Sequence, residues 1–386
     1  MFTRRTFLQT AALSTLLSGA PGLSKASTAS SASNASGASL ASNRTAGRLT
    51  SDRPAVMTVP FPPGGGADVI ARSIAEALAA ELGRPVVVSN RPGAGGTLGA
   101  QGLSRQKPDG ASIGYVTNGI LCVNPILYPK TAFDPMTALE PVGRISEIGL
   151  IAVFNAGAIP ELSGAGALTG AAEATEDSMA ERTESAGAHS RADAGDKADE
   201  RLLQKLLDWA RRHPGELRCA NSGIGTTSHL AGMLFEEKAG IELMHVPFKG
   251  GAAAIVDVLA GRVPLMIDVA PNVLPHVRSG RLAALGAASK ERLAAAPEVP
   301  TLAEMGLAGV ELSAWDGLAL PKGAPKEIAD AVSDALKRAL QRPEVAESLA
   351  KKGAEPRPGT AEAFKAWIEE ERPKWAALAR RAALKA

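Results

Sequence analysis

The sequence has few cysteines, and this limits the classes of fold it can adopt. Cys122 and Cys219 are the two cysteines among 386 residues. Two cysteines so far apart define no disulfide framework, so we expect both to be buried thiols. No cysteine follows the N-terminal apolar stretch where a lipid anchor would need one, and we expect no lipid anchor.

The sequence also lacks the signatures of nucleic-acid, metal and nucleotide binding. Its 42 basic and 40 acidic residues leave a net charge of +2, and no clustered basic stripe suggests a nucleic-acid partner. The five histidines are scattered without metal-ligand spacing. No Gly-Lys-Ser/Thr follows the glycine-rich stretches, which excludes a P-loop. We therefore expect no metal and no cofactor.

The N-terminus has the pattern of a cleaved export signal over residues 1–26. Arg4 and Arg5 precede a mildly apolar stretch over residues 11–20 and a small-x-small pattern that ends at Ala26. This stretch is too short to span a bilayer. The arginine pair resembles a twin-arginine signal, and an ordinary Sec signal is the alternative. Either signal predicts a periplasmic protein.

The length predicts two domains after a flexible spacer. The spacer covers residues 27–52, where Ser, Ala, Asn, Gly and Thr dominate. A second stretch, at about 164–198, has the same lack of apolar periodicity and is expected to be a disordered insertion. Pro373 is expected to interrupt the last helix, predicted over 361–384.

Strands and helices alternate along the rest of the chain. Strands are predicted at 57–61, 85–89, 112–117, 218–220, 244–246 and 265–268, and an extended crossing at 311–321. Helices are predicted at 68–82, 202–210, 325–340 and after the glycine-rich loops, up to Ala239 and Leu259. This alternation predicts an α/β fold with a parallel sheet.

Two polar glycine-rich loops each follow a strand and open a helix, which is where open α/β sheets bind ligands. Helix N-termini there offer unpaired N–H groups and a partial positive charge to a carboxylate. No Lys or Arg lies in either loop. Asp68 either caps its helix or binds an amino group of the ligand. The candidate ligand-binding residues are Gly64, Gly65, Gly66, Ala67, Asp68, Thr117, Asn118, Ser222, Gly225, Thr226, Thr227 and Asp268.

Enzyme classes fit the sequence poorly, and we assign no catalytic residue. The glycines at 93–99 have the wrong spacing for a dinucleotide loop. Ser222 lacks the glycine that a nucleophile elbow needs before it. His229 and His245 are expected to be structural.

Several motifs, in order, resemble the Bug family, the periplasmic receptors of tripartite tricarboxylate transporters. They include the stretches 59–68, 90–96, 222–232 and 245–250 and the region around Trp315. The resemblance covers residue 53 to the C-terminus except the insertion. The chain departs from the family at the insertion, at Phe248, where tyrosine is more usual, and over 263–269.

The resemblance implies a type II periplasmic-binding-protein fold, two α/β lobes joined by two crossing strands. Lobe one would comprise residues 53–148 plus 311–386 and lobe two residues 149–310. It also implies a monomeric solute-binding receptor that closes on a small carboxylate and delivers it to the membrane permease subunits. A periplasmic ligand sensor for a two-component system, or an exported enzyme, is the alternative.

Overall fold

The structure is a computed structural model that describes residues 53–131, 133–165 and 188–385. The predicted signal and the whole predicted spacer lie outside these ranges, and so does the middle of the predicted insertion. Within the described ranges, no helix has the length and apolar character needed to cross a membrane.

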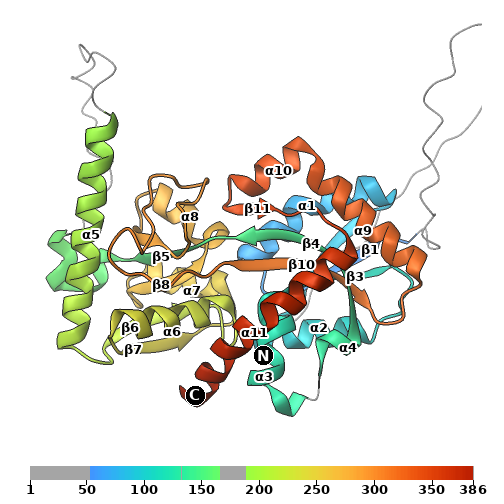
Figure 1. The fold of residues 1–386 in the computed structure, drawn as a ribbon, viewed down its shortest axis with the longest axis horizontal. Coiled ribbons are helices and arrows are strands. Elements are labelled where there is room, and N and C mark those ends of the chain that lie inside the picture. Colours follow the sequence, from blue (N-terminus) through green and yellow to red (C-terminus); the bar gives the residue numbers. More distant parts are fainter. Residues whose placement is uncertain (1–52, 132, 166–187, 386) are drawn as a thin grey trace, which may run out of the picture. The chain divides into compact units, whose positions relative to one another are not determined.

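Eleven strands of the described residues form two sheets (Figure 1). The six-stranded sheet has the order β11-β4-β10-β3-β1-β2, with β1 Ala55–Val59, β2 Val86–Asn90, β3 Ser112–Thr117, β4 Leu139–Ile148, β10 Ala314–Pro321 and β11 Ala354–Pro356. The five-stranded sheet has the order β7-β6-β8-β5-β9, with β5 Leu150–Phe154, β6 Leu217–Asn221, β7 Leu243–Pro247, β8 Leu265–Val269 and β9 Ala283–Ala287. The mixed α/β class is confirmed.

Helices follow most strands, as the alternation predicted. They are α1 Gly66–Leu82, α2 Thr97–Ser104, α3 Asn124–Leu127, α4 Pro135–Ala138, α5 Ala188–Arg212, α6 Thr227–Ala239, α7 Gly251–Leu259, α8 Ala270–Arg278, α9 Lys326–Gln341, α10 Pro343–Ala350 and α11 Ala361–Lys385. In α1, the apolar side chains at helical spacing, Ile70, Ile74 and Leu78, are fully buried. Gly83 ends α1 in the left-handed conformation that favours glycine.

Two expectations about local structure were wrong in part. The 164–198 stretch is not irregular throughout, because α5 begins at Ala188. Residues 188–198 include four alanines and two aspartates, and alanine favours a helix without any apolar periodicity. Pro373 does not interrupt the C-terminal helix either, since it lies inside α11.

The chain passes from one sheet to the other through a single residue. β4 ends at Ile148, β5 begins at Leu150, and the intervening Gly149 has no room for a Cβ beside Leu293. The chain returns from β9 through residues 288–313 to β10, which pairs antiparallel with β4 over its whole length. Both strands belong to the six-stranded sheet (Figure 1). The predicted lobe boundaries stay predictions.

The C-terminal helix α11 packs against the crossing strand β10. Phe364 on α11 is buried, and its ring meets the Trp315 ring edge-on at 5.8 Å between centroids. A Cβ at Gly317 on β10 would overlap the Phe364 ring. The aromatic ring thus packs directly on the β10 backbone.

Phe364→Ala should lower the free energy of unfolding by about 3–5 kcal/mol, because it leaves a cavity beside β10. Urea unfolding followed by circular dichroism measures it. The control, Glu370→Ala on the exposed side of α11, should change stability by under about 0.5 kcal/mol. A loss of under about 1 kcal/mol in Phe364→Ala would contradict this packing.

Asp68 holds the loop between β1 and α1. Its carboxylate accepts hydrogen bonds from the Gly64 N–H at 2.9 Å, from Arg72 Nε at 2.9 Å and from Asn90 Nδ2 at 2.9 Å. Burial opposes ionisation, but the hydrogen bonds from Arg72, Gly64 and Asn90 hold the pKa of Asp68 below its usual value. The ionised side chain therefore stabilises the loop.

Asp68→Asn should cost about 1.5–3 kcal/mol of unfolding free energy at pH 7, because it removes hydrogen bonds to a charged group. The folded-state pKa is lowered, so this contribution is present above the unfolded value and is lost as pH falls through the folded one. The difference between wild type and variant should shrink in urea unfolding below about pH 4. A difference that stays constant from pH 7 to pH 3 would contradict the assignment.

Candidate functional site

One pocket lies where the two sheets meet, with a cavity volume of about 80 Å³. Its walls come from the carboxyl ends of strands, the starts of helices and the crossing strands. The lining residues are Phe61, Pro62, Gly65, Gly66, Ala67, Gly95, Tyr115, Thr117, Asn118, Gly119, Ile148, Ser222, Thr226, Thr227, Gly251, Asp268, Val269, Ala314 and Trp315.

The start of α1 forms one wall. Gly65 is its N-cap, and Gly66 and Ala67 are its first residues. The first N–H groups of a helix have no partner within the helix and carry a partial positive charge. A Cβ on Gly66 would come within 2.5 Å of Val269 Cγ2. Glycine therefore lets the α1 start approach the end of β8.

The start of α6, which follows β6 of the five-stranded sheet, forms another wall of the pocket. Thr226 caps this helix: its Oγ1 accepts from the His229 N–H at 3.4 Å and donates to the Gly223 carbonyl at 2.7 Å. Thr227 exchanges hydrogen bonds with Asn118, which follows β3, at 2.9 and 3.2 Å. The two sheets are thus linked through side chains that line the pocket.

Asp268 lies near the end of β8 with 3% of its surface exposed. Its Oδ2 accepts hydrogen bonds from Ser222 Oγ at 3.0 Å and from Asn272 Nδ2 at 2.7 Å. Burial raises the pKa of Asp268 to about 6, although these hydrogen bonds oppose the rise. The carboxylate form therefore predominates at neutral pH.

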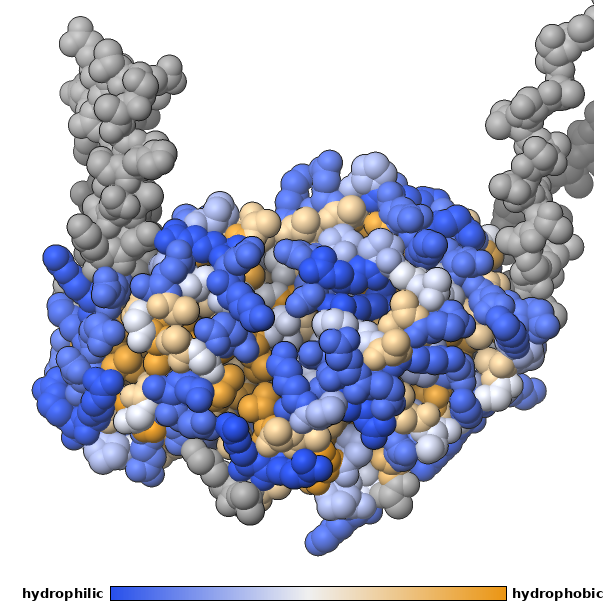
Figure 2. Space-filling model, in the orientation of Figure 1, coloured by the Kyte–Doolittle hydropathy of each residue, from blue (hydrophilic) through white to orange (hydrophobic). Residues whose placement is uncertain are grey.

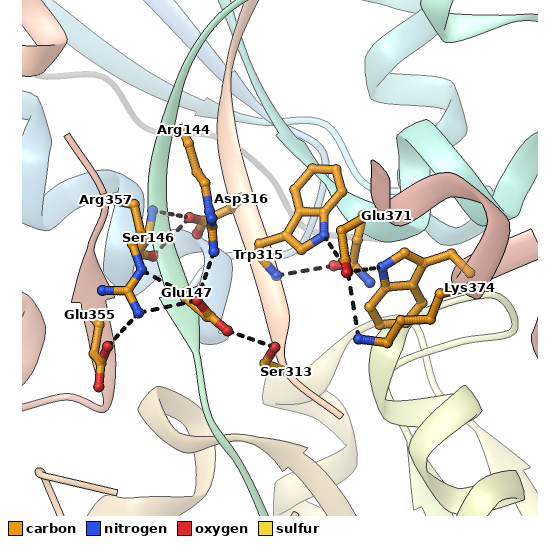
Figure 3. A network of polar contacts seen from close by, with 12 residues as sticks. Arg144, Ser146, Glu147, Ser313, Trp315, Asp316, Glu355, Arg357, Glu371 and Lys374 are labelled. Atoms are coloured by element: carbon orange, nitrogen blue, oxygen red, sulfur yellow. Dashed lines mark hydrogen bonds and ion pairs between the residues drawn. The ribbon is translucent and has the colours of Figure 1, made fainter. Parts of the chain in front are cut away.

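Crossing strand β10 supplies Trp315, which is almost fully buried. Its main-chain N–H donates to Asn118 Oδ1 at 3.4 Å, and its indole N–H donates to Glu371 Oε2 at 3.3 Å (Figure 3). Glu371 on α11 also accepts from the Trp375 indole at 2.8 Å. The Trp315 side chain is therefore held by Glu371, which lies outside the pocket lining, and the Asn118 amide is held by the Trp315 main chain.

A buried carboxylate on the same strand fixes another wall residue. Tyr115 donates its hydroxyl to Asp316 Oδ2, and Ser146 donates its N–H and its hydroxyl to Asp316 Oδ1 at 3.0 and 2.8 Å. Burial raises the pKa of Asp316 to about 6. The cluster ties β3, β4 and β10 together. Figure 3 shows Ser146 and Asp316 of this cluster.

No Lys, Arg or His stands among the described residues that line the pocket. Lys249, in the turn between β7 and α7, is exposed and lies outside the lining. Hydrophilic residues predominate on the face shown in Figure 2, with hydrophobic ones between them. The pocket therefore offers an anion N–H groups and side-chain donors and no cation.

The buried titratable groups outside the pocket lining include one histidine and both cysteines. Burial and then the neighbouring His245 lower the pKa of His229 to about 4. Cys122 and Cys219 are buried free thiols, as expected, and burial raises the pKa of each to about 12. In the part of the chain that the structure describes, no group of three or more His, Cys, Asp or Glu side chains could hold a metal ion.

The pocket brings together most of the predicted ligand-binding residues. They are Gly65, Gly66, Ala67, Thr117, Asn118, Ser222, Thr226, Thr227 and Asp268. Gly64, Asp68 and Gly225 are not in the lining. Gly64 and Asp68 bond to each other, and the Gly225 N–H donates to His229 Nδ1 at 3.4 Å.

The sequence analysis missed the aromatic and apolar walls. Tyr115 and Trp315 belong to β3 and β10, far apart in the sequence, and the strand pairing that brings them together leaves no local signal. Gly251 was also missed, although it opens α7 directly after a strand and a turn, as the two recognised loops do. That spacing could have identified it.

Comparison with known proteins places the chain in a family. The profile described as tripartite tricarboxylate transporter family receptor matches residues 70–161 and 191–384. The solved structure of the periplasmic binding protein BugD is 31% identical, with a TM-score of 0.70, over 85% of this chain and 97% of that one.

Two further solved structures contain ligands. MatC from Rhodopseudomonas palustris with bound malate is 27% identical, with a TM-score of 0.69, over 84% of this chain and 99% of that one. A protein from R. palustris with adipate is 27% identical, with a TM-score of 0.70, over 85% and 97%. The two-sheet fold is thus of the type II periplasmic-binding kind, as predicted. The chain belongs to the tripartite tricarboxylate transporter receptor family, whose members are periplasmic solute-binding receptors rather than enzymes.

Proposed function

We propose that this chain is an extracytoplasmic receptor that closes on a small carboxylate and delivers it to a tripartite transporter. The observation that carries the proposal is the pocket lined by the starts of α1, α6 and α7, with no cationic side chain among its described lining residues. N–H groups at helix starts bind carboxylates without a counter-ion. The relatives with malate and adipate support this ligand class.

The proposal includes two lobes that move against each other. The lobes are residues 53–148 plus 311–386 and residues 149–310. The Asn118–Thr227 hydrogen bonds and the bond from the Tyr128 hydroxyl to the Ile224 carbonyl at 2.8 Å link these parts. Ligand release would require these bonds to break. In this proposal the chain acts as a monomer and docks on membrane permease subunits.

A carboxylate panel tests the ligand class. The chain should show a rise in melting temperature with at least one small carboxylate, because a ligand at 100 times its Kd stabilises a protein by about 2.7 kcal/mol. The matching carboxamides are the control and should give no rise. No rise with any carboxylate would contradict the proposed function.

Pocket hydroxyls and glycines should control affinity for the ligand that the panel identifies. Ser222→Ala and Thr227→Val should each weaken binding about 10- to 150-fold if the hydroxyl proton turns from its acceptor in this structure, Asp268 Oδ2 or Asn118 Oδ1, to the ligand carboxylate. Gly65→Val should weaken ligand binding more, because the added side chain would fill pocket space that the ligand needs. A Cβ at position 65 would lie 3.6 Å from Ala252 N, an ordinary contact distance, so it would not clash with the protein.

Lys249→Ala is the matched control for these variants and should change affinity by less than about tenfold. Calorimetry measures all four. Loss of binding in Lys249→Ala with normal binding in the hydroxyl variants would show that an ion pair holds the ligand.

Export is tested by the arginine pair. Changing Arg4 and Arg5 together to lysine should leave precursor in the cytoplasm, because the folded-protein route requires both arginines. Cell fractionation measures the distribution. An unchanged periplasmic yield would favour the Sec alternative.

A further inference from the structure

Asp268 gives the pocket a feature that carboxylate binding alone does not explain. Among the described lining residues, it is the one carboxylic acid. When it is ionised, its charge has the same sign as the ligand's. A second anionic group close to it would be repelled, because like charges in a desolvated site disfavour each other.

The surroundings of Asp268 supply it with hydrogen-bond donors. Ser222 and Asn272 both donate to Oδ2, at 3.0 and 2.7 Å. The Val269 N–H and the Ser228 hydroxyl are also hydrogen-bond partners of this carboxylate, so a ligand donor at Asp268 would replace one of them. No lysine or arginine stands among the described lining residues to neutralise it.

Gly251 lies directly beside this carboxylate. A Cβ at position 251 would lie 2.8 Å from Asp268 Oδ2, 2.8 Å from Asn272 Nδ2 and 3.1 Å from Ser222 Oγ. Gly251 itself lines the pocket. A side chain there would overlap the cluster, whereas with glycine Asp268, which is 3% exposed, is part of the lining.

We propose that Asp268 is a specificity-determining residue that accepts a hydrogen bond from a hydroxyl or ammonium group of the ligand. The preferred ligands are then carboxylates that carry such a donor. The ligand carboxylate binds at the helix starts and the donor group binds at Asp268. This inference rests on the proposed function and deepens it.

Pairs of acids that differ by one donor group test the inference. Calorimetry at pH 7.5 on the full chain would compare malate and aspartate with succinate, and lactate and alanine with propionate. In at least one pair the donor-bearing acid should bind about 10- to 150-fold more tightly, the range expected for a hydrogen bond to a charged group. If the plain acids bind as tightly within threefold, the inference is overturned while the proposed function stands.

Asp268→Asn tests whether the Asp268 carboxylate, rather than another part of the pocket, causes the preference for donor-bearing acids. The variant keeps the shape of the side chain and should reduce the preference to within about threefold. The control, Asp208→Asn on the exposed surface of α5, should retain it. A preference that survives in Asp268→Asn overturns the inference.

Gly251→Ala provides a second variant in case Asp268→Asn does not fold. Its methyl group would cover Asp268 and should weaken binding of the donor-bearing acid more than that of the plain acid. An equal loss for both acids would overturn the inference. If neither kind of acid binds the wild-type chain, the proposed function fails as well.

Discussion

The pairing of β4 with β10 is the interaction on which the pocket depends. Both strands run antiparallel in the six-stranded sheet, and the chain passes between the sheets at one end of each. Ile148, Ala314 and Trp315, from the ends of these strands, line the pocket. Any shift in their register would move the wall and the connection between the sheets together.

Polar contacts fix this register from both sides. Asp316 on β10 accepts hydrogen bonds from Ser146 on β4 and Tyr115 on β3. Next to it, Glu147 accepts from Ser313 at 2.9 Å and from Arg144 at 2.9 Å (Figure 3). Burial of a carboxylate is unfavourable unless its oxygens are satisfied. Because these partners satisfy their oxygens, Asp316 and Glu147 are tolerated in the crossing strands. Their hydrogen bonds favour one register of β4 against β10.

The sequence predicted the parts of the fold and the site that local patterns determine. The α1 and α6 loops were recognisable because glycines and hydroxyls follow a strand and precede a helix. Asp268 could be named as a candidate. Its partnership with Ser222, 46 residues away, could not, because it depends on β6 and β8 lying side by side. Tyr115 and Asp316, 201 residues apart, meet for the same reason. The start of α5 was missed because a polar, alanine-rich stretch has no apolar period whether or not it is helical.

The account's central claim is that helix N-termini, and no cationic side chain, hold the ligand's carboxylate. A crystal structure of the chain with a bound carboxylate tests this most directly. The account predicts carboxylate oxygens at about 2.7–3.2 Å from main-chain nitrogens at the starts of α1, α6 or α7. A carboxylate bound to a lysine or arginine side chain, with those N–H groups left to water, would contradict it.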